Sequence, residues 1–540
     1  MLPRNLKPEI TASPSALIHS LQEPSVYDHE VKDLAIVETH ISWVVLTGPY
    51  AYKIKKPVNL GFLDFSTLDK RHYYCKEELR LNRRLAPLTY VDVVTITGTP
   101  QAPVLNGTGP PLEYAVQMVQ FPQRAQLDRV LARHALTNKH IYRLAQKVAA
   151  FHNTIDTADK NAPYGTPDRV HDQVMQNFSQ ISSRLGRKID IDRLDELRNW
   201  TETEYNQRLD MLRQRKHSGF IRECHGDMHL RNIALVGDEL LIFDCIEFSD
   251  DLRWIDTMSE VAFIVMDLED RHAPDLARQF LNAYLEFTGD YAGLTVLRYY
   301  LGYRAMVRAM VSIIRSEQTG LTNEEKERAL ANYGDYIALA LRYATVSRPA
   351  LIITHGLSGS GKTTVAQSLL ENQSMIRLRS DIERKRLRGL SPDARSGSTL
   401  GSGLYRPEAS QETYAHLAAL SGTLLASGFT VVVDAAFLKR AERYAFRALA
   451  ERLGVPFVIL DCQASEETLL NRVSTRERQG HDASEANAAV LTYQLATHEP
   501  LTSQEKALTL TIETTHPVDG AQIARALHQQ LPLSSSADYG

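Results

Sequence analysis

The chain has 540 residues, and because single domains average roughly 150 residues, we expect two or three of them. Hydrophobic residues make up 43% and charged residues 23% of the chain, which excludes disordered, collagenous and fibrous classes. The 61 basic and 65 acidic residues give a net charge of −4. This balance excludes a strong positive field, and with it bulk electrostatic binding of long nucleic acid.

The cysteines and the hydrophobic stretches indicate where the protein works. Cys75, Cys224, Cys245 and Cys462 are dispersed, and no CxxC motif pairs them, so neither a disulfide framework nor a zinc site is expected. The N-terminal stretch has no continuous apolar run of the signal-peptide kind. The longest uncharged stretch, 413–433, is interrupted by polar residues and predicts a helix, a turn and a buried strand. We expect a cytoplasmic protein with no membrane segment.

The N-terminal half begins with extended segments and continues with helices. Alternating apolar residues over 33–47 and 50–58, separated by a turn at Gly48 and Pro49, predict two or three antiparallel strands. Helical spacing follows over 76–86, and 113–121 is again strand-like. Helical patterns dominate from about Leu127. This order predicts a small sheet lobe joined to a larger helical lobe, with a cleft between them.

A change of pattern near Pro349 predicts a domain boundary. Upstream, Thr322 and Glu325 have capping-box spacing and open a helix. Downstream, the apolar run 350–354 is followed by a glycine-rich loop and a helix, the beginning of an α/β unit. We expect domains at 1–348 and 349–540.

The candidate chemistry of the first domain lies at 225–232, with the sequence HGDMHLRN. Asp227 and Asn232 are five residues apart, which can place a carboxylate against a substrate hydroxyl and an amide oxygen against a metal ion. Asp244 follows an apolar strand and can hold the same metal. A polar turn with no catalytic role is the alternative interpretation. The joint spacing favours phosphoryl transfer.

These residues resemble the catalytic loop of aminoglycoside phosphotransferases, choline kinases and related small-molecule kinases. The resemblance implies that Asp227 is the catalytic base and that Asn232 and Asp244 bind magnesium. It also implies an ATP-anchoring lysine on the third strand and a glutamate partner on the next helix. Lys53 and Lys55 alternate to the same face of that strand, so spacing leaves both open; Lys53 is preferred. Its partner is Glu78 or Glu77.

The second domain carries the sequence GLSGSGKT at 356–363. Its glycines let backbone N–H groups turn toward phosphates, the following helix N-terminus adds positive potential, and Lys362 reaches the outer phosphates. Thr363 can bind magnesium. The residues that we expect to contact nucleotide are Gly356, Ser358, Gly359, Ser360, Gly361, Lys362, Thr363 and Thr364.

Acidic and basic residues after this loop complete a candidate site. The strand 429–434 ends in Asp434, a candidate magnesium ligand, although a helix cap is the alternative. Asp381 and Arg384 are three residues apart on a predicted helix, so Asp381 can deprotonate an acceptor hydroxyl while Arg384 fixes a nearby anion. Asp381 could instead be an N-cap on a solvated basic face. Arg472 and Arg476 suit either a helical lid over the transferring phosphate or an ordinary surface.

The loop and the later motifs resemble the polynucleotide-kinase, zeta-toxin and gluconate-kinase branch of P-loop kinases over most of 350–510. Both halves in this order look like bacterial proteins described as bifunctional aminoglycoside phosphotransferase/ATP-binding proteins. We therefore expect an α+β protein-kinase-like bilobal domain followed by an α/β P-loop NTPase domain with a parallel sheet.

The resemblances imply a phosphotransferase that uses Mg²⁺ and ATP, or another nucleoside triphosphate, with an alcohol group as acceptor. The expected acceptors are a small molecule in the first domain and a small molecule, a nucleotide or a nucleic-acid end in the second. Two alternatives remain open: one domain could be a nucleotide-sensing switch for the other, or the chain could act as a toxin-antitoxin-like module. The acceptors and the oligomeric state are not indicated by the sequence.

Overall fold

The computed structural model describes residues 15–61, 63–184, 188–318, 320–345, 348–394, 406–479 and 487–531. The chain forms two compact units. The first consists of Met1–Leu136, Thr154–Val170 and Arg213–Ile264, and the second of Thr137–Asn153, His171–Leu212 and Val265–Gly540. Because the second unit contains residues on both sides of position 349, the boundary predicted there remains a proposal.

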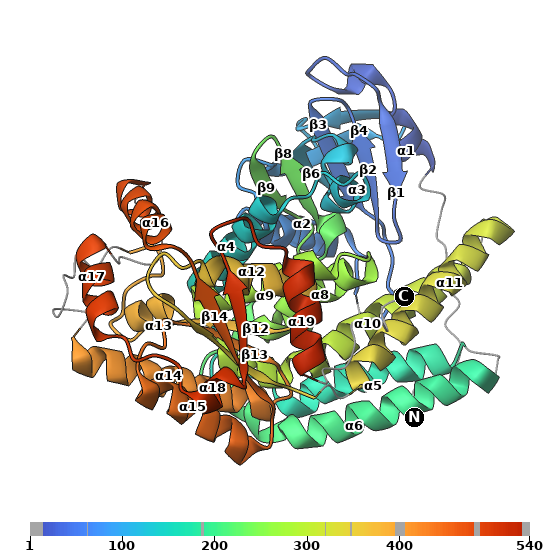
Figure 1. Cartoon of the computed structure of the whole chain (residues 1–540). Coiled ribbons are helices and arrows are strands. Elements are labelled where there is room, and N and C mark those ends of the chain that lie inside the picture. The colour runs from blue at the N-terminus through green and yellow to red at the C-terminus, as the bar shows by residue number, and fades with distance from the viewer. Residues whose placement is uncertain are drawn as a thin grey trace. The chain divides into compact units, whose positions relative to one another are not determined.

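A six-stranded antiparallel sheet, with the order β1-β2-β3-β6-β4-β5, organises the first unit (Figure 1). Its strands are β1 (Ala35–Glu38), β2 (Ser42–Leu46), β3 (Tyr50–Lys55), β4 (Tyr90–Thr99), β5 (Ala102–Leu105) and β6 (Glu113–Val119). The predicted strands and the turn after β2 are thus present. Helix α2 (Leu68–Asn82) contacts β4 and β6.

The two faces of this sheet carry different side chains because successive residues of a strand point to opposite sides. Tyr52 and Ile54 of β3 lie in an apolar cluster with residues of β2, β4 and β6. Lys53 and Lys55 therefore point to the other face, where both contact Glu78 of α2. The alternation of side chains along β3 thus places two buried lysine side chains against α2.

Short strands hold the loop that carries the candidate catalytic residues of this unit. β7 (Ile221–Glu223) pairs with β10 (Trp254–Asp256), and β8 (Ile233–Val236) pairs with β9 (Glu239–Ile242), both antiparallel. The loop 225–232 connects β7 to β8 and ends in the short helix η3 (Leu230–Asn232). The other short helices here are α1 (Ser15–Ser20), η1 (Pro24–Val26), η2 (Gln123–Ala125), α3 (Leu127–Ala132) and α7 (Asp250–Arg253).

Helices dominate the N-terminal part of the second unit. α4 (Asn138–Thr154), α5 (Pro167–Ser182), α6 (Lys188–His217) and α8 (Thr257–Asp270) lie partly or mainly in it, and α9 (Pro274–Thr288), η4 (Tyr291–Gly293), α10 (Leu294–Ser316) and α11 (Asn323–Ala344) lie wholly in it. The predicted capping box is confirmed: the Thr322 hydroxyl accepts from the Glu325 backbone N–H, and the Glu325 carboxylate accepts in return. The aromatic residues of α10, Tyr299, Tyr300 and Tyr303, are buried.

A five-stranded parallel sheet with the order β12-β13-β11-β14-β15 forms the C-terminal part of the second unit. Its strands are β11 (Leu351–His355), β12 (Ile376–Arg379), β13 (Val431–Asp434), β14 (Phe457–Gln463) and β15 (Thr509–Glu513). Its helices are α12 (Lys362–Asn372), α13 (Ser380–Arg386), α14 (Pro407–Ala426), α15 (Arg440–Leu453), α16 (Glu466–Gln479), α17 (Ala488–Thr497), α18 (Ser503–Lys506) and α19 (Gly520–Gln530).

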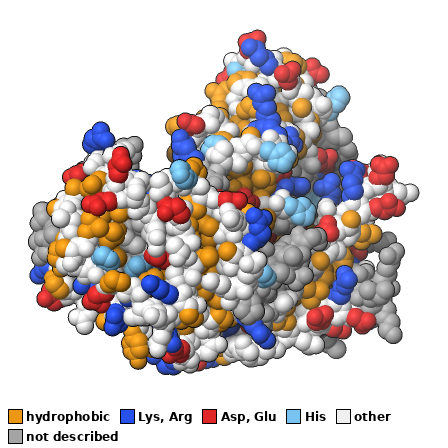
Figure 2. Space-filling view, viewed as in Figure 1, with side chains coloured by type: hydrophobic (Ala, Val, Ile, Leu, Met, Phe, Trp, Pro, Cys, Tyr) orange, Lys and Arg blue, Asp and Glu red, His pale blue; other side chains and the backbone are white. Residues whose placement is uncertain are grey.

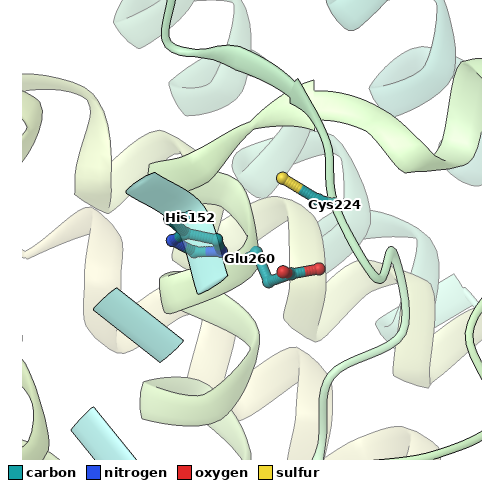
Figure 3. A group of neighbouring side chains, drawn as sticks. All are labelled: His152, Cys224 and Glu260. Carbon is teal, nitrogen blue, oxygen red and sulfur yellow. The ribbon is translucent and has the colours of Figure 1, made fainter. Parts of the chain in front are cut away.

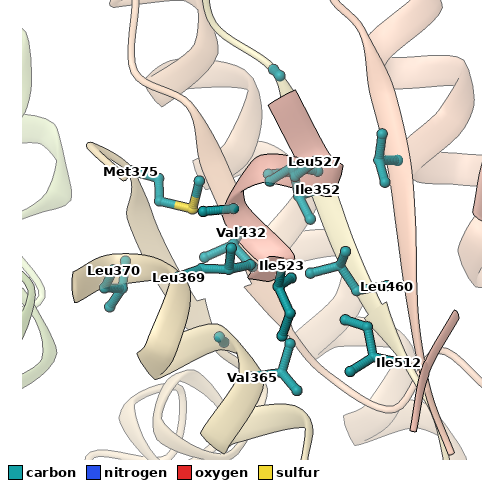
Figure 4. Packing of buried hydrophobic residues seen from close by; sticks show 14 of the residues in the cluster. Ile352, Val365, Leu369, Leu370, Met375, Val432, Leu460, Ile512, Ile523 and Leu527 are labelled. Carbon is teal, nitrogen blue, oxygen red and sulfur yellow. The ribbon is translucent and has the colours of Figure 1, made fainter. Parts of the chain in front are cut away.

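One face of this sheet packs against α12 and α19. Ile352 and Val432 from the sheet meet Leu369 from α12 and Leu527 from α19 in a fully buried apolar cluster (Figure 4). This packing fixes α12 against β11, so the loop between them has a rigid strand before it and a rigid helix after it. The predicted kinase-like sheet lobe and the parallel P-loop sheet are both confirmed.

The surface and the helices agree with the composition. Lys and Arg side chains are interspersed with Asp and Glu on the face shown in Figure 2. Among the described residues, no helix has both the length and the apolar character needed to cross a membrane.

Candidate phosphoryl-transfer sites

The loop between β7 and β8 is built around Gly226. Its φ of +89° lies in the left-handed region, and a Cβ placed there would lie 2.6 Å from the Leu252 carbonyl oxygen. The Gly226 N–H donates a 2.7 Å hydrogen bond to the Glu260 carboxylate of α8, whose oxygen and the Cys224 sulfur lie within 4.8 Å of each other (Figure 3). Only glycine fits this close approach without moving the loop.

Asn232 orients Asp227 within the same loop. The Asn232 side-chain amide nitrogen donates to the Asp227 carbonyl oxygen and to its carboxylate oxygen, both at 3.0 Å. His229 Nε2 lies 3.4 Å from the same carboxylate, whose side chain is 35% exposed. Because the amide nitrogen serves Asp227, the amide oxygen of Asn232 is the atom available to a metal ion. The Asp227 carboxylate is therefore held in one orientation and is still accessible to a ligand.

His225 anchors the start of the loop. Its Nε2 lies 2.9 Å from the Phe243 carbonyl oxygen, next to Asp244. Burial lowers the pKa of His225, so this imidazole is neutral near pH 7 and donates through Nε2. The bond ties the loop 225–232 to the segment that carries the predicted metal ligand.

A buried chain of alternating charges supports Asp244. Lys53 Nζ lies 2.8 Å from Glu78 Oε1 and 2.5 Å from Asp244 Oδ1. Lys55 Nζ lies 2.8 Å from Glu78 Oε2 and also contacts Glu247. Glu78, Lys55 and Glu247 are almost wholly buried, whereas the Asp244 side chain is 47% exposed. Lys53 thus pairs with Asp244, the partly exposed acid, and Lys55 pairs with Glu247, the buried one.

The charges in this chain keep both lysines and Glu78 ionised. Burial alone would lower the pKa of Lys53, but Asp244 and Glu78 raise it well above its ordinary value. Burial would raise the pKa of Glu78, but Lys53 and Lys55 lower it to about 2. Each charge is paired, as buried charges must be.

Asp244 occupies an unusual backbone conformation. Its φ is +64°, a left-handed value that residues other than glycine rarely adopt. Its N–H donates to the Tyr90 hydroxyl at 3.1 Å, and the next N–H, of Cys245, donates to Asn82 of α2 at 2.9 Å. Surrounding contacts hold this conformation, which turns the Asp244 carboxylate toward Lys53.

The phosphate loop of the second unit has the backbone that its glycines predicted. Gly356, Gly359 and Gly361 have φ values of +141°, +84° and +82°. A Cβ at Gly356 would lie 2.5 Å from Ser360 Oγ and 2.6 Å from the Cys462 carbonyl oxygen. The buried Ser360 hydroxyl has no hydrogen-bond partner among the described residues. The loop therefore fits a phosphate group, which would supply the missing partner.

Lys362 lies inside this loop. Its Nζ donates to the Leu357 carbonyl oxygen at 2.8 Å. Burial lowers its pKa, which Asp434 and Asp381 raise and Arg476 lowers. Two predicted acids and one predicted arginine are thus near enough to Lys362 to act on its charge.

The alternative interpretation of Asp381 and Asp434 as helix caps is wrong. Asp381 is the second residue of α13, whose N-cap is Arg379, and its carboxylate lies 3.4 Å from Arg384 Nη1. Asp434 ends β13, whereas the following helix begins at Arg440. Both carboxylates lie at the carboxyl ends of neighbouring parallel strands, where α/β sheets place their ligands.

One of the two predicted lid arginines, Arg472, contacts the phosphate loop. Arg472 of α16 donates to the carbonyl oxygens of Gly359 and Thr514, at 3.2 and 2.5 Å, so it ties α16 to the phosphate loop. Ser358 N–H donates to Gln494 of α17 at 2.8 Å. Thr363 and Thr364 are the second and third residues of α12 and line a cavity of about 490 Å³ in the second unit.

The sequence did not reveal the parts played by Lys55, Glu247 and Glu260. Glu260 is only 1% exposed, and its carboxylate accepts a hydrogen bond from the Gly226 N–H. Glu247 follows Asp244 by three residues, and this spacing is the one signal that could have drawn attention to it.

The fold and these sites define a chain with a kinase-type phosphotransferase part and a P-loop nucleotide-binding part. Residues 74–298 match the Phosphotransferase enzyme family, and residues 351–501 match the AAA domain family. Each match covers less than half of the chain, so one segment is similar to phosphotransferases and the other to AAA domains.

Individual similar proteins are distant. An uncharacterized protein of Mycobacterium tuberculosis is 27% identical over 466 residues, which cover 86% of this chain and 91% of that protein. An ethanolamine kinase of Plasmodium vivax has 10% identity and a TM-score of 0.37, covering 59% of this chain and 86% of its own. A gluconokinase of Sinorhizobium meliloti has 24% identity and a TM-score of 0.24, covering 34% and 98%.

Proposed function

We propose that the chain is a magnesium- and nucleoside-triphosphate-dependent phosphotransferase with two active sites, one in 1–348 and one in 349–540. The observation that carries the proposal is the Asp227–Asn232 hydrogen bond in a loop that His225 ties to the Asp244 segment, together with the contact of Asp244 with the Lys53–Glu78 pair. Phosphoryl transfer needs positioning and electrostatic stabilisation rather than new covalent chemistry. The first unit would supply both the positioning and the electrostatic stabilisation, from residues that lie far apart in the sequence.

In the first site, Asp227 accepts the proton of an acceptor hydroxyl, and Asn232 holds its carboxylate in place. Asn232 Oδ1 and Asp244 would hold magnesium, which neutralises charge on the phosphates when bound. Lys53 would contact the nucleotide phosphates, with Glu78 fixing its ammonium group. The acceptor is proposed to be a small molecule with an alcohol group.

Asp227→Asn tests this assignment. The variant should lose about 10²–10⁴-fold in transfer to a small-molecule acceptor, found by screening metabolites, because general-base catalysis contributes this much. Its nucleotide affinity should stay within a few-fold of the wild type, since Asp227 acts on the acceptor. Unchanged turnover would show that Asp227 is not the base.

In the second site, the phosphate loop and Lys362 would bind the nucleotide, with Thr363 and Asp434 holding magnesium. Asp381 would deprotonate the acceptor, Arg384 would bind its anionic neighbour, and Arg472 and Arg476 would close over the phosphates. That Asp381 lies at a strand end and caps no helix supports a kinase over a nucleotide switch.

Asp381→Asn separates these two possibilities. In a kinase it should greatly lower phosphoryl transfer while nucleotide affinity changes only a few-fold, and Arg384→Ala should mainly raise the acceptor KM. The exposed Glu412→Gln on α14 is a matched loss of one carboxylate. If Asp381→Asn and Glu412→Gln behaved alike in transfer, the switch interpretation would replace the kinase one.

A further inference from the structure

Helix α9 brings residues of the two family matches into contact within the second unit. α9 lies in the stretch that matches the phosphotransferase family, whereas β12 and α13 lie in the stretch that matches the AAA domain family. β12 is an edge strand of the parallel sheet, so one row of its backbone groups faces away from the other strands. α9 contacts this edge.

The Asn282 side chain of α9 pairs with the edge of β12 in the way that a neighbouring strand would. Its Oδ1 accepts from the Arg377 N–H at 2.8 Å, and its Nδ2 donates to the carbonyl oxygen of Met375, just before β12, at 3.1 Å. Asn282 is 3% exposed. Because buried backbone groups need hydrogen-bond partners, this contact fixes the position of β12 along α9.

Glu286, one turn later on α9, holds two arginines of β12. Its Oε1 accepts from two guanidinium nitrogens of Arg377, at 3.0 and 2.7 Å, and its Oε2 lies 3.5 Å from Arg379 Nη1. The Glu286 and Arg377 side chains are 5% and 8% exposed. Burial would raise the pKa of Glu286, but the two arginines lower it. The carboxylate is therefore ionised, and the contact joins opposite charges.

The C-terminal end of α9 also holds α13. Arg386 of α13 donates to the Glu286 carbonyl oxygen at 2.7 Å, one of the carbonyl groups that a helix leaves unpaired at its C-terminus. Gly289 ends α9 with a φ of +73°, and a Cβ there would overlap the Arg386 guanidinium. Glycine therefore both ends the helix and lets this arginine reach it.

These contacts lie on both sides of Asp381 in the sequence. Arg377 and Arg379 precede it, and Arg386 follows it. The segment 376–386 is therefore held by α9 at each end, with the proposed acceptor residues in between. A displacement of about 1 Å can lower a reaction rate by about 10²-fold. The placement of this segment thus decides whether the Asp381 carboxylate reaches an acceptor hydroxyl.

We propose that the second active site depends on α9 and that Glu286 is a positioning residue for phosphoryl transfer there. Through Arg377 it holds β12, and thereby the start of α13, where Asp381 lies. The inference rests on the proposed kinase function of residues 349–540, and it adds that this site needs a helix from outside those residues.

The test uses the full chain and follows the γ-phosphate of labelled ATP into a pool of small metabolites. A labelled product that disappears in Lys362→Ala belongs to the second site, and its acceptor is then used alone. With this acceptor, Glu286→Gln should have a kcat about 10²-fold lower than the wild type. The KM for ATP should change only a few-fold, because the packing of β11 and α12 holds the phosphate loop.

Glu505→Gln is the matched control. Glu505 is also paired with a buried arginine, Arg443 of α15, in the same part of the second unit. This pair lies outside the segment 376–386. Glu505→Gln should therefore keep kcat within a few-fold of the wild type, even if it lowers the melting temperature as much as Glu286→Gln does.

A double variant separates positioning from stability. Glu286→Gln leaves Arg377 buried without an ionised partner, which should lower the melting temperature. Glu286→Gln combined with Arg377→Met removes this lone charge, so the melting temperature should recover. The kcat should stay low, because the Glu286–Arg377 contact between α9 and β12 is still absent. A role confined to stability would restore both quantities.

Three results would overturn the inference: a wild-type kcat in Glu286→Gln, a wild-type kcat in the double variant, or an equal loss of kcat in Glu505→Gln. If no labelled product depended on Lys362, the proposed function of the second site would be refuted, and this inference with it. A product that depends on Lys362 but not on Glu286 would refute the inference alone.

Discussion

Lys53 and Lys55 leave β3 on the same face, but the structure assigns them different energetic roles. The Lys55 side chain and its partner Glu78 are fully buried, and Glu247 is 3% exposed. Lys53 is 11% exposed and shares the half-exposed Asp244. Removing one partner from a buried ion pair typically costs about 3–5 kcal/mol, since the other charge is left uncompensated. Lys55→Met should therefore destabilise the sheet lobe far more than Lys53→Met.

The magnitude can be followed in the full chain by hydrogen exchange of peptides from α2. Opening free energies lowered by about 3–5 kcal/mol correspond to roughly 10²–10⁴-fold faster exchange. The double variant Lys55→Met with Glu247→Gln should recover part of this loss, because no lone charge remains at Glu247. Lys53→Met should change α2 exchange little and instead weaken nucleotide binding.

Two outcomes would refute this reasoning. Exchange of α2 that is unchanged in Lys55→Met would show that the pair adds no net stability. A Lys53→Met variant less stable than Lys55→Met, yet with normal nucleotide binding, would reverse the two assignments. Lys56→Met is the matched control, since the neighbouring Lys56 contacts the exposed Glu38 and lies outside the buried chain.

Gly226→Ala should lower transfer at the first site by about 10²-fold, because its Cβ would push the loop away from Leu252. Transfer kinetics check this prediction, and nucleotide affinity is the control. The pKa of Glu78, about 2 against its ordinary 4.5, lies below the unfolded value. The stabilisation of the fold by ionised Glu78 is therefore full above about pH 4.5 and is lost as the pH falls toward 2. Glu78→Gln should flatten this part of an acid-unfolding curve. Because burial lowers the pKa of Lys362, bound nucleotide phosphates should raise it again. Binding at alkaline pH should take up protons, seen by calorimetry in two buffers, and none should be taken up in Lys362→Ala.

Local motifs carried most of the correct predictions. The strand, glycine loop and helix at 351–372 could be read directly, because each glycine with positive φ lies within a few residues of the others. The capping box at Thr322 is equally local. Period-two alternation placed Lys53 and Lys55 on one face but could not separate them, since the residue that distinguishes them, Glu247, is 192 positions away from Lys55.

Long-range contacts also explain what the sequence missed. The role of Glu260 could not be predicted, because its partner is a backbone N–H 34 positions earlier in the chain, which no pattern of side chains reveals. The contact between α9 and β12 pairs Glu286 with Arg377, 91 positions apart. Both features depend on how helices pack, and packing is not encoded in any one motif.

The most direct test of the central claim follows the γ-phosphate of labelled ATP into acceptors from a pool of small metabolites. It compares four full-length proteins: the wild type, Asp227→Asn, Lys362→Ala and the double variant. Two active sites predict that the single variants lose different labelled products and that the double variant transfers no label. Label transfer that survives in the double variant would contradict both sites, and a single variant that removes every product would leave one catalytic site.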